Sequence, residues 1–289
     1  MAKTAATGYG PTKLVAIEQH FPESARIIND DLAEPILPFR TRASLRLWML
    51  LLPRDRMVAF WERRTPGLWG GLLCRKRYLD DRLAEAAGGQ VETVVNLGAG
   101  MDTQAYRLPA LAKLRVFEVD LPVNIATKRS RLKKVLGEVP SHVTLVPVDF
   151  DRGDLEAVLA SHGYATDART FFVWEGVTQY LTEAGVRATM DFLAKGSAGS
   201  RLAFTYVRKD FVDGEVLYGH EYIYKTLVLK GKNWRFGIDP ESVADFLSGY
   251  GWRMLEHLGF DELAERYVKP TGRKLLSMPL ERMVYAEKL

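Results

Sequence analysis

The chain has 289 residues, of which 47% are hydrophobic and 26% are charged. These values are typical of a globular protein with a large core, and they exclude disordered and collagen-like classes. The net charge is only +4, but the window from Arg40 to Arg77 holds ten basic and two acidic residues, a net +8. This window predicts either a solvated basic face or a region that attracts an anionic substrate or surface.

The cysteine content and the apolar runs indicate the cellular compartment that suits the protein. The single cysteine, Cys74, excludes an intrachain disulfide and a cysteine-based zinc site, so a reducing compartment fits. The first 13 residues lack the apolar core of a signal peptide, and the longest apolar run, Leu47–Pro53, is too short to span a bilayer. We therefore expect a cytoplasmic protein without an integral membrane segment, although a peripheral contact with lipid stays open.

Residues 1–90 favour helices broken by irregular pieces. Apolar residues recur at helical spacing near Leu14 and again near Leu79, while several prolines interrupt the stretch between them. We expect this region to form a helical cap, in which residues 40–74 act as a lid over a binding pocket. The apolar lid residues, Trp61 and Trp69 among them, could instead pack on one another.

From Val91 onward, short β-branched and apolar runs alternate with helical patterns. Five such runs come first and two more follow near the end of the sequence: residues 91–97, 114–120, 142–150, 169–175, 200–207, 252–259 and 282–288. This alternation predicts an α/β fold with a seven-stranded, mostly parallel sheet covered by helices on both faces. The second domain would span 91–289, with an insert rich in Tyr, Phe and Lys at about 208–240.

Ligands bind beyond the carboxyl ends of the strands in such sheets. The first strand runs into a turn with Gly98 and Gly100, which would let the backbone approach a ligand closely, but the third glycine of the dinucleotide pattern is absent. The second strand ends in Asp120, 20 residues after Gly100, where an acid can accept hydrogen bonds from a ribose. Glu118 lies on the same face of that strand.

The next two strand ends are also acidic. Asp149 could accept from an adenine amino group while Phe150 packs on the ring, and Glu175 closes the fourth strand. Together these residues place negative charge along one edge of the sheet. Such an edge disfavours a pyrophosphate cofactor and favours the cationic S-adenosylmethionine.

Three motifs also resemble a known family. The stretches "VVNLGAGMDTQAYRL", "FEVDLP" and "EGVTQYL", in this order and spacing, resemble the leucine carboxyl methyltransferase family, and the Gly176 motif is closest to its bacterial small-molecule O-methyltransferases. The resemblance covers roughly residues 75–207. It implies a class I methyltransferase (Rossmann-like) fold that binds S-adenosylmethionine.

The resemblance also implies residue roles. Arg75 would pair with the methionine carboxylate of the cofactor, Gly98 would form the glycine turn, and Glu175 would lie near the methionine ammonium. Asp120 would hold the ribose, and the Asp149–Phe150 pair would hold the adenine. Tyr180 would lie close to the transferred methyl group. The cofactor would then supply the counter-charge that a buried Glu175 needs.

The acceptor class follows from the absence of an evident base. A carboxylate is already ionised at neutral pH, whereas a hydroxyl would need a general base, for which His220 is the least improbable histidine. We expect an amphipathic carboxylic acid, held by Trp61, Trp69 and Tyr180 and converted to its methyl ester. Alternatives left open are O-methylation of a phenol or alcohol, an NAD(P)-dependent oxidoreductase, and a non-catalytic binder.

Two further partners are not expected. No spacing of His, Asp or Glu suggests a metal site. No Asn/Asp-Pro-Pro-aromatic motif or separate target-recognition domain suggests a nucleic-acid substrate. The sequence identifies neither the acceptor nor the oligomeric state.

Overall fold

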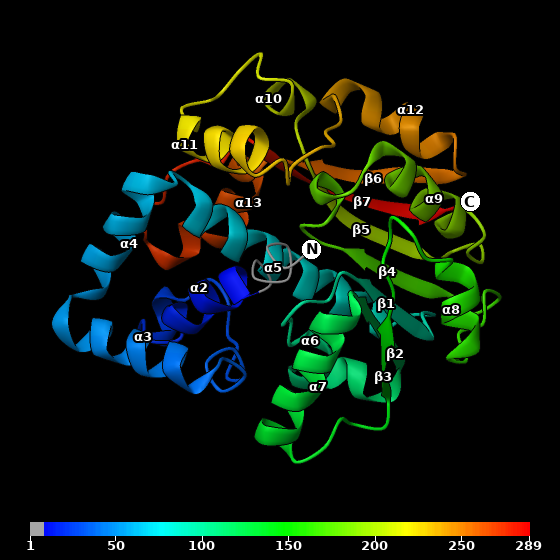
Figure 1. The fold of residues 1–289 in the computed structure, drawn as a ribbon, viewed down its shortest axis with the longest axis horizontal. Helices are drawn as coiled ribbons and strands as arrows, with labels where there is room; N and C mark the ends of the chain where they lie inside the picture. Colours follow the sequence, from blue (N-terminus) through cyan, green and yellow to red (C-terminus); the bar gives the residue numbers. More distant parts are fainter. Residues whose placement is uncertain (1–8) are drawn as a thin grey trace.

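The computed structural model describes residues 9–289. Its centre is a seven-stranded sheet in the order β3-β2-β1-β4-β5-β7-β6, in which only β7 runs antiparallel to its neighbours (Figure 1). The strands lie close to where the sequence predicted them: β1 Thr93–Leu97, β2 Arg115–Asp120, β3 Val143–Pro147, β4 Thr170–Trp174, β5 Arg201–Val207, β6 Trp252–Leu258 and β7 Glu281–Lys288. The expected seven-stranded, mostly parallel α/β fold is therefore confirmed.

Alternate residues of each central strand enter two separate cores. Val94 and Phe171 belong to one buried cluster, and their neighbours Val95 and Phe172 belong to the other. Both faces are apolar because each is covered by helices, as parallel strands require. The first face packs against α5 (Leu68–Ala87), α7 (Pro122–Leu136) and α13 (Phe260–Tyr267), and the second against α8 (Leu155–Ser161), α9 (Glu183–Leu193) and α12 (Val243–Ser248).

Local capping fixes where two of these helices begin. The Asp154 side chain accepts a hydrogen bond from the Ala157 amide at 3.0 Å, and the Thr182 hydroxyl accepts one from the Gly185 amide at 3.1 Å. Each bond satisfies an amide that the first turn of a helix leaves unpaired. Apart from the insert after β5, the other short helices that follow β1 are α6 (Gln104–Arg107), η3 (Pro109–Lys113), η4 (Thr178–Tyr180), η6 (Pro240–Ser242) and η7 (Lys269–Thr271).

The N-terminal region is helical, as expected. It comprises α2 (Gly10–Glu18), the short η2 (Glu23–Ala25), α3 (Phe39–Leu51), α4 (Arg54–Arg64) and the long α5. Because Leu73, Tyr78 and Leu83 of α5 are fully buried in the core of the first sheet face, α5 joins the cap to the sheet. Helices α3 and α4 form a hairpin at one end of the molecule, away from the sheet (Figure 1).

The insert after β5 folds back toward this cap. It contains α10 (Lys209–Val212), α11 (Glu221–Ile223) and a π-helical turn, η5 (Tyr224–Lys230). Figure 1 shows α11 on the same side of the sheet edge as α4. Within the described range 9–289, no helix combines the length and apolar character needed to cross a bilayer.

Candidate active site

A cavity of about 720 Å³ lies at the carboxyl ends of the parallel strands. Its volume is in the range of small-molecule sites, roughly 300–1,000 Å³. The strand ends form its floor, and α2, α5, the α3–α4 hairpin and the insert form its walls. Nine of the expected site residues line it: Trp61, Arg75, Gly98, Gly100, Asp120, Asp149, Phe150, Glu175 and Tyr180.

The turn after β1 depends on glycine. Gly98 has a φ of +79° and Gly100 a φ of +45°, backbone conformations that residues other than glycine rarely adopt. A Cβ atom at Gly98 would also lie 2.2 Å from Cγ2 of Val177. Strand one therefore ends in backbone that leaves the cavity open beside it.

Asp120 ties this turn to the next helix. Its Oδ2 accepts a hydrogen bond from the Gly100 amide at 2.6 Å, while Oδ1 accepts from the Leu121 amide at 2.6 Å and from Nδ2 of Asn124 at 2.7 Å. An ionised carboxylate offers about four acceptor positions, so three donors still leave room for a ligand hydroxyl. Asp120 thus has a structural role in addition to any contact with a ribose.

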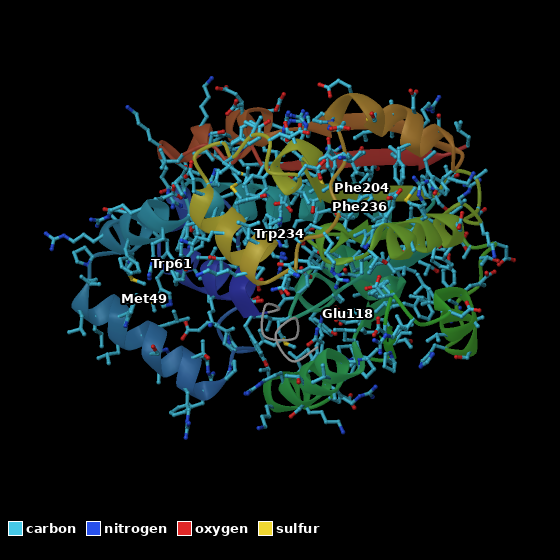
Figure 2. All side chains as sticks on the ribbon, turned by 45° about the horizontal axis from the view of Figure 1, so that its top comes forward. Met49, Trp61, Glu118, Phe204, Trp234 and Phe236 are labelled. Atoms are coloured by element: carbon cyan, nitrogen blue, oxygen red, sulfur yellow. The ribbon has the colours of Figure 1, made fainter. Side chains whose placement is uncertain are left out.

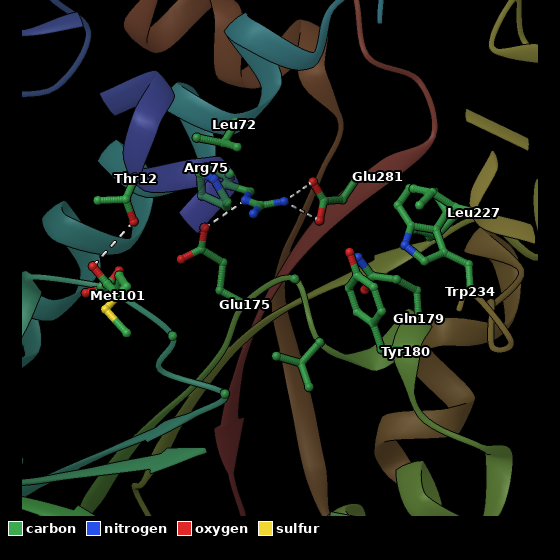
Figure 3. Close-up of a pocket in the computed structure, with 18 of the residues that line it drawn as sticks. Thr12, Leu72, Arg75, Met101, Glu175, Gln179, Tyr180, Leu227, Trp234 and Glu281 are labelled. Atoms are coloured by element: carbon green, nitrogen blue, oxygen red, sulfur yellow. Dashed lines mark hydrogen bonds and ion pairs between the residues drawn. The ribbon is translucent and has the colours of Figure 1, made fainter. Parts of the chain in front are cut away.

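The buried Glu175 is balanced by protein cations, not by a ligand alone. Its Oε1 accepts from Nε of Arg75 at 2.7 Å, and its Oε2 accepts from Nζ of Lys76 at 3.1 Å. Arg75 also donates from Nη1 to both oxygens of Glu281, at 2.7 and 2.6 Å, as Figure 3 shows. The expectation that the cofactor supplies the counter-charge of Glu175 is therefore corrected.

Lys76 extends this group to a second carboxylate. Its Nζ donates to Oδ2 of Asp102 at 2.7 Å. Burial alone would raise the pKa of Asp102, but the ammonium groups of Lys76 and Lys128 bring it to about 2. Burial would likewise lower the pKa of Arg75, but the carboxylates of Glu281 and Glu175 raise it, so its guanidinium is charged.

We call these five side chains the charged cluster: Arg75, Lys76, Asp102, Glu175 and Glu281. All five line the cavity, and their side chains are only 8–14% exposed. Two cations and three carboxylates give a net charge of −1. Such a set can accept both ends of an amino-acid zwitterion, because it offers a guanidinium for a carboxylate and acids for an ammonium.

The loop after β3 supplies another wall. Asp149 and Phe150 both line the cavity, and Phe150 is 9% exposed. Asp149 accepts a hydrogen bond from the Asp151 amide at 3.1 Å, a contact within its own loop and not an ion pair. A planar ring could lie against Phe150 here while Asp149 accepts from its edge.

The opposite end of the cavity is apolar. Trp61 of α4, Tyr180 of η4, and Ile223, Leu227 and Trp234 of the insert line it. The rings of Tyr180 and Trp234 meet edge to face, with centroids 6.4 Å apart. We call this part of the cavity the apolar chamber.

Trp234 brings a buried donor to the apolar chamber. The residue is 9% exposed, and its Nε1 has no hydrogen-bond partner among residues 9–289. In Figure 3 the indole nitrogen of Trp234 points to the side on which Gln179 and Tyr180 lie. A buried N–H without a partner costs about 1–3 kcal/mol, so this donor is suited to a ligand oxygen.

Two expected residues lie away from the cavity. Trp69 is 1% exposed in the core beneath the cap, where its Nε1 donates to Oε2 of Glu18 at 3.3 Å. His220 is 3% exposed at the start of α11, and burial lowers its pKa. Neither lines the cavity, because both side chains are buried elsewhere, so a substrate contact for Trp69 and a catalytic role for His220 are both corrected.

Four residues of the site were not anticipated: Lys76, Asp102, Trp234 and Glu281. Asp102 lies inside the quoted glycine motif, and Lys76 follows Arg75, so both were within reach of the sequence patterns. Glu281 and Trp234 carry no local signal, because one begins β7 and the other follows the irregular η5.

Comparison with known proteins agrees with this geometry. A family model described as leucine carboxyl methyltransferase matches residues 9–194. A Mycobacterium avium (strain 104) protein named "Putative S-adenosyl-L-methionine-dependent methyltransferase" is 30% identical over 261 residues, covering 86% of this chain and 84% of its own. A Streptomyces coelicolor protein of the same description is 28% identical and covers 95% of this chain and 90% of its own.

Solved structures share the fold. A DUF574 family protein from Streptomyces avermitilis superposes with a TM-score of 0.56 at 15% identity, covering 82% of this chain and 91% of that one. A magnesium protoporphyrin IX methyltransferase from Synechocystis, solved with bound SAH, gives 0.50 at 14% identity and covers 76% and 86%. These likenesses confirm the class I methyltransferase fold, and with the family match they show that the chain belongs to the leucine carboxyl methyltransferase family.

Proposed function

We propose that this protein is a methyltransferase that transfers a methyl group to an oxygen of a small amphipathic acid, with its methyl ester as product. Its cofactor is S-adenosylmethionine, which when bound supplies an electrophilic methyl group on a sulfonium sulfur. The residues of the cavity fit this cofactor. Arg75 and the acids around it would hold the methionine end, Asp120 the ribose, and Asp149 with Phe150 the adenine.

The orphaned N–H of Trp234 carries the proposal for the acceptor. It lies in the apolar chamber beside Tyr180, so a ligand that reaches it with an oxygen lone pair would satisfy it, while an apolar body would fill the rest. Lys13 and Arg235 also line the cavity and would attract an anion. These groups together favour a carboxylate with a sizeable apolar portion.

Catalysis would then rest on positioning. None of the chain's five histidines lines the cavity. A carboxylate arrives ionised and needs no base, so the protein has to orient the acceptor oxygen, hold it beside the methyl donor and exclude water. Tyr180 and Trp234 would orient the acceptor oxygen, and Trp61 with Leu227 would help to exclude water.

The direct test is to incubate the protein and S-adenosylmethionine with matched carboxylic acids, phenols and alcohols of equal apolar size. Mass spectrometry should find methyl esters of the acids and no methyl ethers. Gradual change of rate with chain length is expected, because each buried CH₂ contributes only about 0.8 kcal/mol. Methylation of phenols or alcohols in place of their carboxylic counterparts would show that the acceptor is a hydroxyl.

A further inference from the structure

The α3–α4 hairpin is only loosely joined to the protein core. No residue of α3 is buried, and Met57 is the single buried residue of α4. The hairpin also lies at one end of the long axis of the molecule, opposite the C-terminus (Figure 1). A surface helix normally buries a stripe of apolar side chains against the protein core. Because α3 and α4 bury so little, most of their apolar side chains lie outside the core.

One side of the hairpin faces inward. Leu45 and Trp61 line the cavity, and Met49 packs against the core cluster. Figure 2 shows the Met49 and Trp61 side chains on this part of the molecule. These residues account for the inward stripe, whereas Leu47, Leu50 and Leu51 of α3 remain exposed.

The other side forms an exposed apolar tip. Leu47, Leu50 and Leu51 follow the i, i+3, i+4 spacing of a single helix face and are 54%, 84% and 70% exposed. Trp48 and Phe60, 41% and 38% exposed, meet edge to face with ring centroids 6.0 Å apart. We call the segment 47–56, with Phe60, the hairpin tip.

The charges around this tip are mostly positive. From Phe39 to Arg64 there are seven arginines and only two acids, Asp55 and Glu62, a net charge of +5. Six of the arginines are exposed, and Arg54 and Arg56 follow directly after the exposed leucines. An apolar surface edged by guanidinium groups matches the layered chemistry of an anionic lipid surface, acyl chains beneath phosphate.

We propose that the hairpin tip docks on the surface of an anionic lipid membrane. Helices of 13 and 11 residues are too short to span a bilayer, so they lie in the interface with the leucines inserted and the arginines at the phosphates. A second copy of this chain is a poorer occupant, because a twofold contact through the tip would bring the arginines of both copies together.

Docking at this place has a consequence that rests on the proposed function. The hairpin separates the bilayer from the cavity, since its inner side carries Leu45, Trp61 and Thr65 of the cavity wall. An amphipathic acid could therefore pass from the membrane to the apolar chamber without crossing bulk water. The docking itself needs no acceptor and is tested without one.

The test is flotation of the full chain with vesicles of phosphatidylcholine containing about 25% phosphatidylglycerol, against pure phosphatidylcholine vesicles. The wild type should bind the anionic vesicles at least tenfold more tightly, and added salt should weaken that binding. The double variant Leu50→Glu/Leu51→Glu should bind at least tenfold more weakly than the wild type. A matched control is Leu255→Glu/Leu289→Glu, whose leucines are 43% and 66% exposed and lie outside the hairpin.

Several results would overturn the proposal. One is a wild type that ignores anionic vesicles, and another is a control double variant that loses binding equally. A third is light scattering that finds a dimer dissociated by Leu50→Glu/Leu51→Glu, which would make the tip a contact between copies. If that variant fails to fold, as judged by its melting temperature and cofactor affinity, Arg54→Gln/Arg56→Gln decides, because it should abolish the preference for anionic vesicles.

Discussion

The two ends of the cavity are built on opposite plans. At the charged cluster, five nearly buried side chains satisfy one another through short ion pairs before any ligand arrives. At the apolar chamber, aromatic and aliphatic side chains surround one donor, Trp234 Nε1, that lacks a partner among the described residues. The first end is complete in itself, whereas the second is completed by its ligand.

This difference teaches which ligand each end can select. A buried network of ion pairs tolerates one arrangement of charges, because any unpaired charge there costs several kcal/mol. An apolar wall discriminates weakly, since one methylene changes the binding free energy by about 0.8 kcal/mol. The charged end therefore suits one invariant cofactor, and the apolar end suits a class of acceptors.

The largest test of this contrast is Arg75→Met. The change leaves the Glu175 and Glu281 carboxylates without their shared guanidinium, so the free energy of unfolding should fall by about 3–5 kcal/mol. Calorimetry should also find little remaining affinity for S-adenosylmethionine. Denaturant unfolding provides the first measurement.

Arg77→Met is the matched control for that test. Arg77 is 41% exposed, pairs with Asp81 one helical turn away and lies over the Tyr267 ring at 5.9 Å, so its loss should cost about 1 kcal/mol or less. Equal effects at positions 75 and 77 would mean that the charged cluster is not the preorganised end of the cavity.

A second test addresses Asp120, which ties the glycine turn to the start of α7. Asp120→Asn replaces one of the two oxygens that accept from three protein donors and should weaken a ribose site, so cofactor affinity should fall by about 1.5–3 kcal/mol, or roughly 10- to 150-fold. Asp154→Asn, at the start of α8 and outside the cavity, should leave calorimetric affinity unchanged. A neutral Asp120→Asn would contradict the ribose role.

The third test moves to the apolar chamber. Trp234→Phe keeps an aromatic ring but removes the orphaned N–H, so KM for the acid should rise about tenfold, the equivalent of about 1.4 kcal/mol. Affinity for S-adenosylmethionine should not change. Steady-state kinetics and cofactor titration separate the two effects.

Trp69→Phe is the control, because it also removes an indole N–H, but one that bonds Glu18 in the core. Its effect should appear in stability and not in KM. An unchanged KM in Trp234→Phe would assign the acceptor oxygen to another donor and would leave the chamber purely apolar.

The last test concerns a histidine outside both ends. Burial and the nearby Arg282 lower the pKa of His257 to about 4, from about 6.5 when unfolded. The folded state therefore binds fewer protons than the unfolded state between these values, and stability contributed by neutral His257 is lost as pH falls from about 6.5 to 4. The ring is partly exposed, so solvent screening reduces the effect to about 1–2 kcal/mol.

His257→Gln should remove this part of the pH dependence in unfolding measurements at pH 7 and pH 4.5. Turnover at pH 7 should stay within about tenfold of wild type, because loss of a general base typically costs 10²–10⁴-fold. A variant that unfolds with the same pH dependence as wild type would contradict the lowered pKa of His257. Loss of turnover would contradict its lack of a role in catalysis.

The sheet could be predicted because its signals are local. Runs such as Thr170–Trp174 are apolar on both faces, which is typical of a parallel strand between helices. Strand ends then place Asp120 and Glu175 at one edge by topology alone. The same reasoning could not separate Asp120 from Glu118, which lies two residues earlier on β2, is fully buried and pairs with Lys128 at 2.7 Å.

The partners of the site residues could not be predicted in this way. Arg75 lies 100 residues from Glu175 and 206 from Glu281, so no periodicity links them. Trp61 and Trp69 look alike in a tryptophan-bearing lid, yet one lines the cavity and the other is packed in the core. Their difference arises from the break between α4 and α5, where Gly67 adopts a φ of +70° and turns the chain.

The antiparallel course of β7 sets the order in which the site can be assembled. Because β7 runs against β5, its first residue, Glu281, reaches the edge where the parallel strands end. The Arg75–Glu281 pair closes a loop of about 200 residues, so it forms only after β7 has been synthesised and has docked. Until that moment the nascent chain carries Arg75 with an incomplete set of partners, so the charged cluster is completed late in folding.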